Sequence, residues 1–102
     1  MIEGGIYFDS VVIDKSCLFI IVLIKNNCAI GFYIFFPEEE NITQNKINSK
    51  ISDPLYRKEI INHAWYDRLK DIEDDCNGYL GQISKEYLLD LQSLAKEKFD
   101  YL

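Results

Sequence analysis

One long apolar stretch constrains the fold more than any other feature of the sequence. Residues 17–36 read CLFIIVLIKNNCAIGFYIFF and are polar only around their centre. A stretch of this length could span a membrane as a helix, but Lys25 would then lie near the bilayer centre, at a cost of roughly 2.5 to 3.5 kcal/mol. Each half is instead rich in β-branched and aromatic residues. We therefore predict two strands, joined by a tight hairpin turn in which Asn26 and Asn27 adopt positive φ angles.

A two-residue turn sets the pairing of these strands and makes both faces of the hairpin apolar. One face is expected to pair Leu23 with Ile30, Ile21 with Phe32, Phe19 with Ile34, and Cys17 with Phe36. The other is expected to pair Leu18 with Phe35, Ile20 with Tyr33, Val22 with Gly31, and Ile24 with Ala29. Both faces then need cover, and small residues such as Gly31 favour close approach by a helix, so we expect the cover to come from the chain itself.

The preceding residues add a third strand. The segment IYFDSVVID has strand composition and DKS is typical of a turn, which predicts an antiparallel meander from about Ile6 to Phe36. Asp9 and Ser10 interrupt the apolar pattern, as expected of an edge strand. The polar segment 37–53 is predicted to be a loop, with room for one short extra strand.

Helical signals begin at Asp53, a favourable N-cap, followed by Pro54 at the first helical position. Apolar residues then recur at spacings of three and four, which predicts a helix over about 54–75 that ends with Asn77 or Gly78 in a left-handed cap conformation. The stripe consists of Ile61, Trp65, Leu69, Ile72 and Cys76.

A second helix is predicted over about 85–100, after Ser84. Ile83 and Leu88 flank its start in the positions of a hydrophobic staple, and Leu91, Ala95 and Phe99 continue the buried stripe. The prediction is a single α+β domain over 1–102: a three-stranded antiparallel meander (about 6–36) followed by two helices (about 54–75 and 85–100).

The segment EDDCNGYLGQIS, residues 73–84, raises the question of a calcium loop. Glu73, Asp75 and Asn77 occupy ligand positions of an EF-hand, and Gly78 occupies the turn. Ser84 stands where the closing bidentate glutamate belongs, which removes two oxygen ligands. We therefore expect a capped turn with an acidic surface and no bound metal.

Catalytic patterns are scarce. His63 has Asp67 four residues later, but no Ser or Cys is placed for activation by that histidine. One His and three dispersed Cys make no zinc pattern, and the glycines form no phosphate-binding loop. We predict a protein that is not an enzyme and needs no cofactor.

Charge and cysteine usage restrict the partners and the compartment. The formal net charge of −6 argues against nucleic acid or an anionic membrane as the main partner and favours a basic one. The pairing places Cys17 and Cys28 about 27 Å apart, too far for a disulfide, so we interpret both as buried thiols. The odd cysteine count and the lack of a secretory signal pattern at the start predict a cytoplasmic protein.

In its size, acidity, Ile- and Asn-rich composition and lack of a catalytic set, the chain resembles the immunity proteins of bacterial toxin–immunity systems, such as those of contact-dependent growth inhibition. The resemblance covers the whole chain as a layout and rests on no signature motif. It implies a cytoplasmic protein that binds one cognate toxin domain, often a basic nuclease, and masks its active site or substrate surface.

Two clusters of carboxylates are the predicted partner-binding sites, because they can meet a basic surface. They comprise Glu38, Glu39 and Glu40 after the third strand, and Asp67, Asp71, Glu73, Asp74 and Asp75 near the end of the first helix. We expect a monomer in the free state. The alternative is a structural or regulatory subunit whose apolar sheet face is an oligomer interface.

Overall fold

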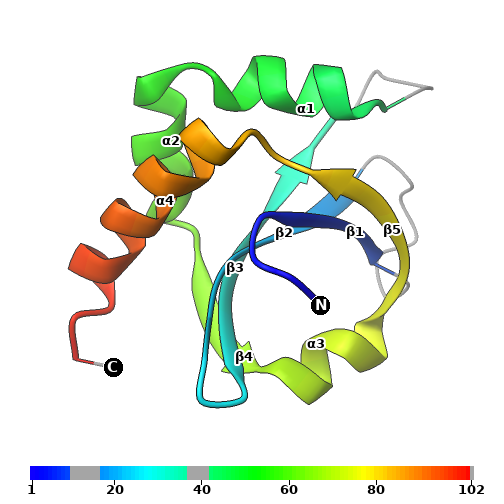
Figure 1. Cartoon of the computed structure of the whole chain (residues 1–102), viewed down its shortest axis with the longest axis vertical. Helices are drawn as coiled ribbons and strands as arrows, with labels where there is room; N and C mark the ends of the chain where they lie inside the picture. Colours follow the sequence, from blue (N-terminus) through cyan, green and yellow to red (C-terminus); the bar gives the residue numbers. More distant parts are fainter. Residues whose placement is uncertain (10–16, 37–41, 102) are drawn as a thin grey trace.

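The computed structural model describes residues 1–9, 17–36 and 42–101. In this part of the chain a five-stranded antiparallel sheet combines with four helices (Figure 1). In chain order the elements are β1 (Gly5–Asp9), β2 (Cys17–Lys25), β3 (Cys28–Phe35), α1 (Gln44–Ile51), α2 (Pro54–Ile61), β4 (Trp65–Arg68), α3 (Leu69–Asp75), β5 (Cys76–Gln82) and α4 (Lys85–Lys98). The strand order is β4-β3-β2-β1-β5. The α+β class is confirmed, and two further strands flank the expected meander.

The β2–β3 hairpin turns as predicted, but its register holds only near the turn. Asn26 and Asn27 have φ angles of 53° and 65°, and Leu23 faces Ile30 as expected. A register shift at Val22 then places Ile21 opposite Gly31 instead of Phe32. The predicted pair of Val22 with Gly31 and all predicted pairs from Ile21 back to Cys17 are therefore wrong by one residue. A β-bulge adds one residue to β2 and makes Val22 and Leu23 face the same side.

Strand β1 is not the edge strand that Asp9 and Ser10 suggested. It lies between β2 and β5, with Ile6 opposite both Ile20 and Gly81, and the sheet edges are β4 and β5. Ser10 lies outside the described residues.

The predicted helix over 54–75 is wrong in its second half. Its start is confirmed, since the Asp53 side chain accepts a hydrogen bond from the Leu55 amide at 3.0 Å, but α2 ends at Ile61. There the Lys98 ammonium donates to three carbonyl oxygens, those of Ile61, Asn62 and Ala64, at 3.0, 2.7 and 3.0 Å. The chain then turns and pairs as β4 with the free edge of β3. Residues 77–78, which were expected to form the helix cap and a loop, belong instead to strand β5, which pairs with β1.

Segment 37–53 also contains a helix where a loop was expected. In its described part, Thr43 caps α1 by accepting from the Lys46 amide at 3.2 Å. Ile47 and Ile51, one helical turn apart, are fully buried. Helix α4 is confirmed, with Leu91, Ala95 and Phe99 buried along one side.

The sheet is curled. Helix α3 connects the two edge strands β4 and β5 with no intervening residue, and its seven residues span only about 10 Å. In a flat sheet four interstrand steps would separate those edges by about 19 Å. The edges must therefore approach each other, and the bulge in β2 together with two register shifts between β1 and β5 supplies the bending.

The curled sheet separates two apolar cores. We call the side under α1, α2 and α4 the outer face and the side closed by α3 the inner face; Figure 1 shows the three helices together and α3 apart from them, between the ends of β4 and β5. The buried outer core contains Ile6, Leu18, Ile20, Val22, Ile30, Phe32, Ile34, Phe36, Ile47, Ile51, Ile61, Ala64, Ile83, Leu91, Ala95 and Phe99. The buried inner core contains Tyr7, Phe19, Ile21, Ala29 and Ile72.

The expectation that the chain itself covers both faces of the hairpin is confirmed. Leu18, Ile20 and Val22 on the outer face, like Ile21 on the inner face, are fully buried. Phe35 is the exception, since 46% of its surface remains exposed.

Candidate functional site

The second predicted acidic cluster lies on two consecutive elements, β4 and α3. Asp67 lies on β4, and Asp71, Glu73, Asp74 and Asp75 lie on α3; we call these five residues the acidic surface. All are exposed except Asp71, which is partly buried. The first cluster, Glu38, Glu39 and Glu40, lies outside the described residues.

The position of α3 follows from its sequence. Leu69 and Ile72 pack against the inner core, and the Leu69 amide donates a hydrogen bond to the Asn27 carbonyl at 2.8 Å. These contacts fix the helix to the tip of the β2–β3 hairpin. Because apolar residues occupy the side of α3 that faces the sheet, the carboxylates of α3 face outward.

The acidic surface is strongly charged for its size. Residues 67–75 carry five carboxylates and two cationic side chains. Five negative and two positive charges give this segment a net charge of −3, which is half of the net charge of −6 of the whole chain. Arg68 pairs with Asp71 at 2.9 Å, but 77% of its side chain is exposed, so this ion pair is weak in water. Glu73 lies 3.8 Å from the amino group of Met1. A hollow of about 500 Å³ opens beside Asp71, Glu73 and Asp74.

Aromatic rings line the inner face next to α3. The Trp65 ring centroid lies 5.1 Å from that of Phe19 and 4.9 Å from that of Tyr33, so Trp65 packs against the inner core as the stripe suggested. Tyr79 on β5 lies 5.5 Å from Tyr7 and is 54% exposed. Burial raises the pKa of Tyr7, although its hydroxyl accepts a hydrogen bond from the Ile2 amide, which acts in the opposite direction.

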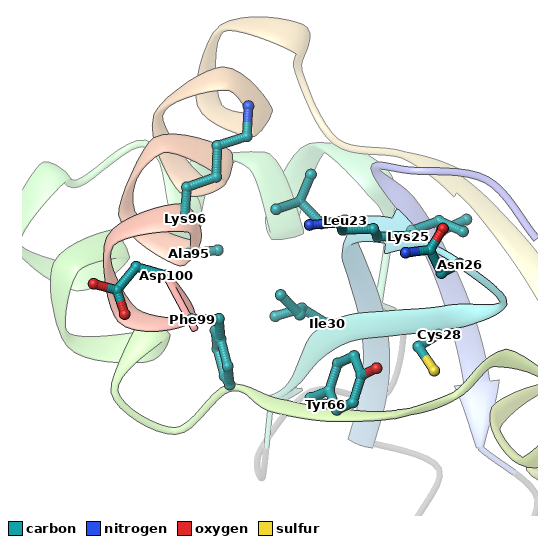
Figure 2. A pocket seen from close by; sticks show the side chains of 11 residues that line it. Leu23, Lys25, Asn26, Cys28, Ile30, Tyr66, Ala95, Lys96, Phe99 and Asp100 are labelled. Atoms are coloured by element: carbon teal, nitrogen blue, oxygen red, sulfur yellow. The ribbon is translucent and has the colours of Figure 1, made fainter. Parts of the chain in front are cut away.

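A second hollow, which we call the hairpin hollow, lies on the outer face (Figure 2). It has a volume of about 520 Å³ and lies between the tip of the β2–β3 hairpin, β4 and the last turns of α4. Leu23, Ile30, Tyr66, Ala95 and Phe99 contribute its apolar walls. The sequence did not predict this hollow, because the residues of β4 were expected to be helical. Tyr66 was therefore not expected to lie on the sheet.

Cys28 and Tyr66 lie together at one side of the hairpin hollow. A hydrogen bond with the Cys28 thiol is the main cause of a raised pKa of Tyr66. Neither Cys17 nor Cys28 is in a disulfide, as expected, but both are partly exposed, so the interpretation as buried thiols is wrong. Each is the first residue of its strand, away from the fully buried middle of the hairpin.

The calcium-loop segment is divided between two elements. Glu73 and Asp75 belong to α3, whereas Asn77 and Gly78 belong to β5, and Cys76 between them is extended with φ −105°. Among the described residues, no group of three or more His, Cys, Asp or Glu side chains is placed to hold a metal ion. His63 is exposed in the turn after α2, and Asp67 lies on β4 instead of one helical turn away.

No family model, curated protein or solved structure matches the chain significantly. Within residues 1–9, 17–36 and 42–101, no helix has the length and apolar character needed to cross a membrane.

Proposed function

We propose that this protein is an immunity protein, which binds a cognate bacterial toxin domain and neutralises it by masking its active site or substrate surface. The observation that supports this proposal is the acidic surface, whose five carboxylates lie on two consecutive elements. The toxin domain is expected to be basic, as a nuclease is, because a protein that attracts a polyanion also attracts this surface. Binding takes place in the cytoplasm, between a monomer of this chain and one toxin domain.

Electrostatic attraction would act mainly on the rate and specificity of association. Opposite charges steer two proteins together over distances of about a Debye length, roughly 8 Å at physiological salt. Glu73, Asp74 and Asp75 lie in the last turn of α3, where the helix dipole disfavours negative charge by a few tenths of a kcal/mol at exposed positions. Their negative charges at this end therefore lower the stability of α3. Contact with a basic partner would explain why the sequence has them there.

A growth assay tests the proposal directly. The protein is expressed with the product of the gene immediately upstream of its own, in cells for which that product is toxic. We expect growth to be rescued and the two proteins to purify together. If the upstream product is not toxic, or if the protein fails to protect the cells, the proposal loses its support.

Charge variants of the complex then test the role of the acidic surface. Replacing Asp71, Asp74 and Asp75 together by Asn should slow association by about tenfold or more at low salt and flatten its salt dependence. The matched control replaces Glu59, Glu86 and Glu97 by Gln, which removes the same charge from exposed positions on α2 and α4. Stopped-flow kinetics compares the two. Equal association rates for both triple variants would move the binding site away from α3.

The alternative is a subunit with an apolar sheet-face interface, and the residues expected to form that interface are covered by the chain itself. Leu18, Ile20 and Val22, which such an interface would require, are fully buried under the helices. Gel filtration separates the two functions, since we expect a monomer of 12.0 kDa. A tight homodimer would favour the alternative.

A further inference from the structure

The walls of the hairpin hollow offer mainly apolar contact. Leu23 and Ile30 form its floor from the hairpin, Ala95 and Phe99 form a wall from α4, and Tyr66 lines it from β4 (Figure 2). The β-bulge in β2 creates this floor, because it turns Leu23 to the same face as Ile30. The volume of about 520 Å³ is in the range of pockets that enclose small molecules, roughly 300 to 1,000 Å³. The hollow is therefore large enough for a bulky side chain of a partner.

Polar groups around the hollow already interact within the chain. The Tyr66 hydroxyl and the Cys28 thiol form a hydrogen bond with each other, and Lys25 also interacts with another group of the protein. The charged ends of Lys96 and Asp100 point away from the hollow (Figure 2). An occupant therefore gains mainly from the burial of apolar surface and needs no charged or polar end.

Strand β4 connects the hairpin hollow to the acidic surface. Tyr66 lines the hairpin hollow, and Arg68 lines the hollow beside α3. Residues two apart on a strand project from the same face and lie about 7 Å apart. Asp67 lies between them in the chain, and Arg68 pairs with Asp71 of the acidic surface at 2.9 Å. Since a standard interface covers about 800 Å² of each partner, a patch roughly 30 Å across, one partner can contact both the acidic surface and the hairpin hollow.

We propose that the hairpin hollow receives a large aromatic side chain of the same toxin domain that meets the acidic surface. This inference rests on the proposed function and adds the contact that slows dissociation. Charged groups act mainly on the rate and specificity of association, whereas a few buried, mostly aromatic anchors carry most of the binding energy of an interface. Tyr66 is 43% exposed and is of a residue type that is enriched among such anchors.

Charge next to the hollow favours the toxin domain over a second copy of this chain. A symmetric pair of hairpin hollows would bring two copies of segment 67–75 near each other, each with five carboxylates and two cationic side chains. Like charges across an interface oppose association. A basic toxin domain carries the opposite charge, so the same carboxylates attract it to this side of the molecule.

Dissociation kinetics of the complex with the upstream gene product test this proposal. Tyr66→Ala removes one wall of the hollow and should raise the dissociation rate by at least about tenfold, with the association rate nearly unchanged. Tyr66→Phe keeps the ring and should dissociate at nearly the native rate, because the hydroxyl group is not needed by the occupant. The matched control is Leu89→Ala, which removes a side chain that is 57% exposed on α4 and lies outside the hollow. It should leave both rates unchanged.

Amide hydrogen exchange of the native protein gives a second test that needs no variant. We expect the amides of Ile30, Tyr66 and Phe99, together with those of α3, to exchange more slowly in the complex than in the free protein. Protection of α3 alone would show that the partner does not reach the hollow.

The outcomes separate this inference from the function on which it rests. If the native complex forms but Tyr66→Ala dissociates no faster than Leu89→Ala, the hollow is not the anchor site and the immunity function stands. If no complex forms with the upstream gene product, the proposed function fails and this inference fails with it. A homodimer of the free protein that Tyr66→Ala dissociates would assign the hollow to a second copy, contrary to the proposal.

Discussion

The two faces of the sheet are covered in very different ways. The outer face supports three helices and sixteen of the buried core residues in the described part of the chain. The inner face has five buried residues and one helix of seven residues. Both faces are nevertheless shielded from solvent at their centres, since Val22 on the outer face and Ile21 on the inner face are fully buried.

Curvature accounts for this inequality. When a sheet curls, its concave side loses area and its convex side gains it, so one short helix can close the first and three helices are needed for the second. Two flat faces of a three-stranded sheet would have required more helix than the sequence was predicted to contain. The bulge in β2 and the edge-to-edge connection through α3 bend the sheet. They therefore reduce the area of the inner face that helices must cover.

The largest expected effect comes from a charge on either face. Val22→Asp and Ile21→Asp change neighbouring residues that point to opposite cores, and each places an unpaired carboxylate in an apolar interior, at a cost of several kcal/mol. Both variants should unfold or lose most of their stability in urea denaturation.

Leu55→Asp is the control, because Leu55 is 76% exposed on α2 and should change stability by less than about 0.5 kcal/mol. A folded, soluble Ile21→Asp variant would show that the inner face is a docking surface and not a core. The same result for Val22→Asp would favour the oligomer interface.

A smaller effect is expected at Gly31, where the curl brings β3 close to the inner core. A Cβ atom at this position would meet the Phe19 ring and lie 2.6 Å from the Ile20 carbonyl oxygen. Gly31→Ala should therefore destabilise by about 1 to 3 kcal/mol, the usual cost of overpacking. At Gly78 on β5 the nearest atom, Cδ2 of Phe8, lies at 2.9 Å on a side chain that can move. Thermal unfolding should show a clearly smaller loss for Gly78→Ala, and equal losses would contradict the crowding of the inner face.

The smallest expected effect is that of calcium on the α3–β5 connection. Because the possible ligands of residues 73–84 are divided between a helix and a strand, and the closing glutamate is missing, calcium should neither bind tightly nor stabilise the protein. Melting curves with millimolar calcium and with millimolar magnesium should coincide. A rise of several degrees with calcium alone would refute the prediction.

Local signals in the sequence predicted the parts of the fold that depend on neighbouring residues. The hairpin turn follows from Asn26 and Asn27, the start of α2 from Asp53 and Pro54, and α4 from its apolar stripe. These features need no distant partner, so composition and spacing were sufficient to find them.

The parts that were missed depend on distant residues. Ile61, Trp65 and Ile72 have helical spacing, yet Ile61 faces the outer core and the other two contact the inner core. Pairing of residues 65–68 with the free edge of β3 overrides that spacing, and β5 forms because β1, some 70 residues earlier, offers a second edge. The bulge at Val22 has no local sequence signature either, because its position depends on the bending of the whole sheet.

Composition alone identified the acidic residues, and the fold places five of them on two consecutive elements, β4 and α3. Their separation from the hairpin hollow could not be foreseen, because the hollow is bounded by β4 and by the end of α4. Its location depends on which way Leu23 points, and therefore on the bulge.

The pairing of β1 with β5 also matters during synthesis. Strand β1 can join β2 and β3 as soon as they leave the ribosome, but its other edge must wait for Gln82, the partner of Gly5. At about 5 to 20 residues per second this delay lasts several seconds. During that time the nascent meander presents an unpaired and strongly apolar strand, which is the kind of edge that joins other chains. Translation speed and chaperone contact at this stage are therefore expected to affect the yield of folded protein, in addition to the stability of the finished sheet.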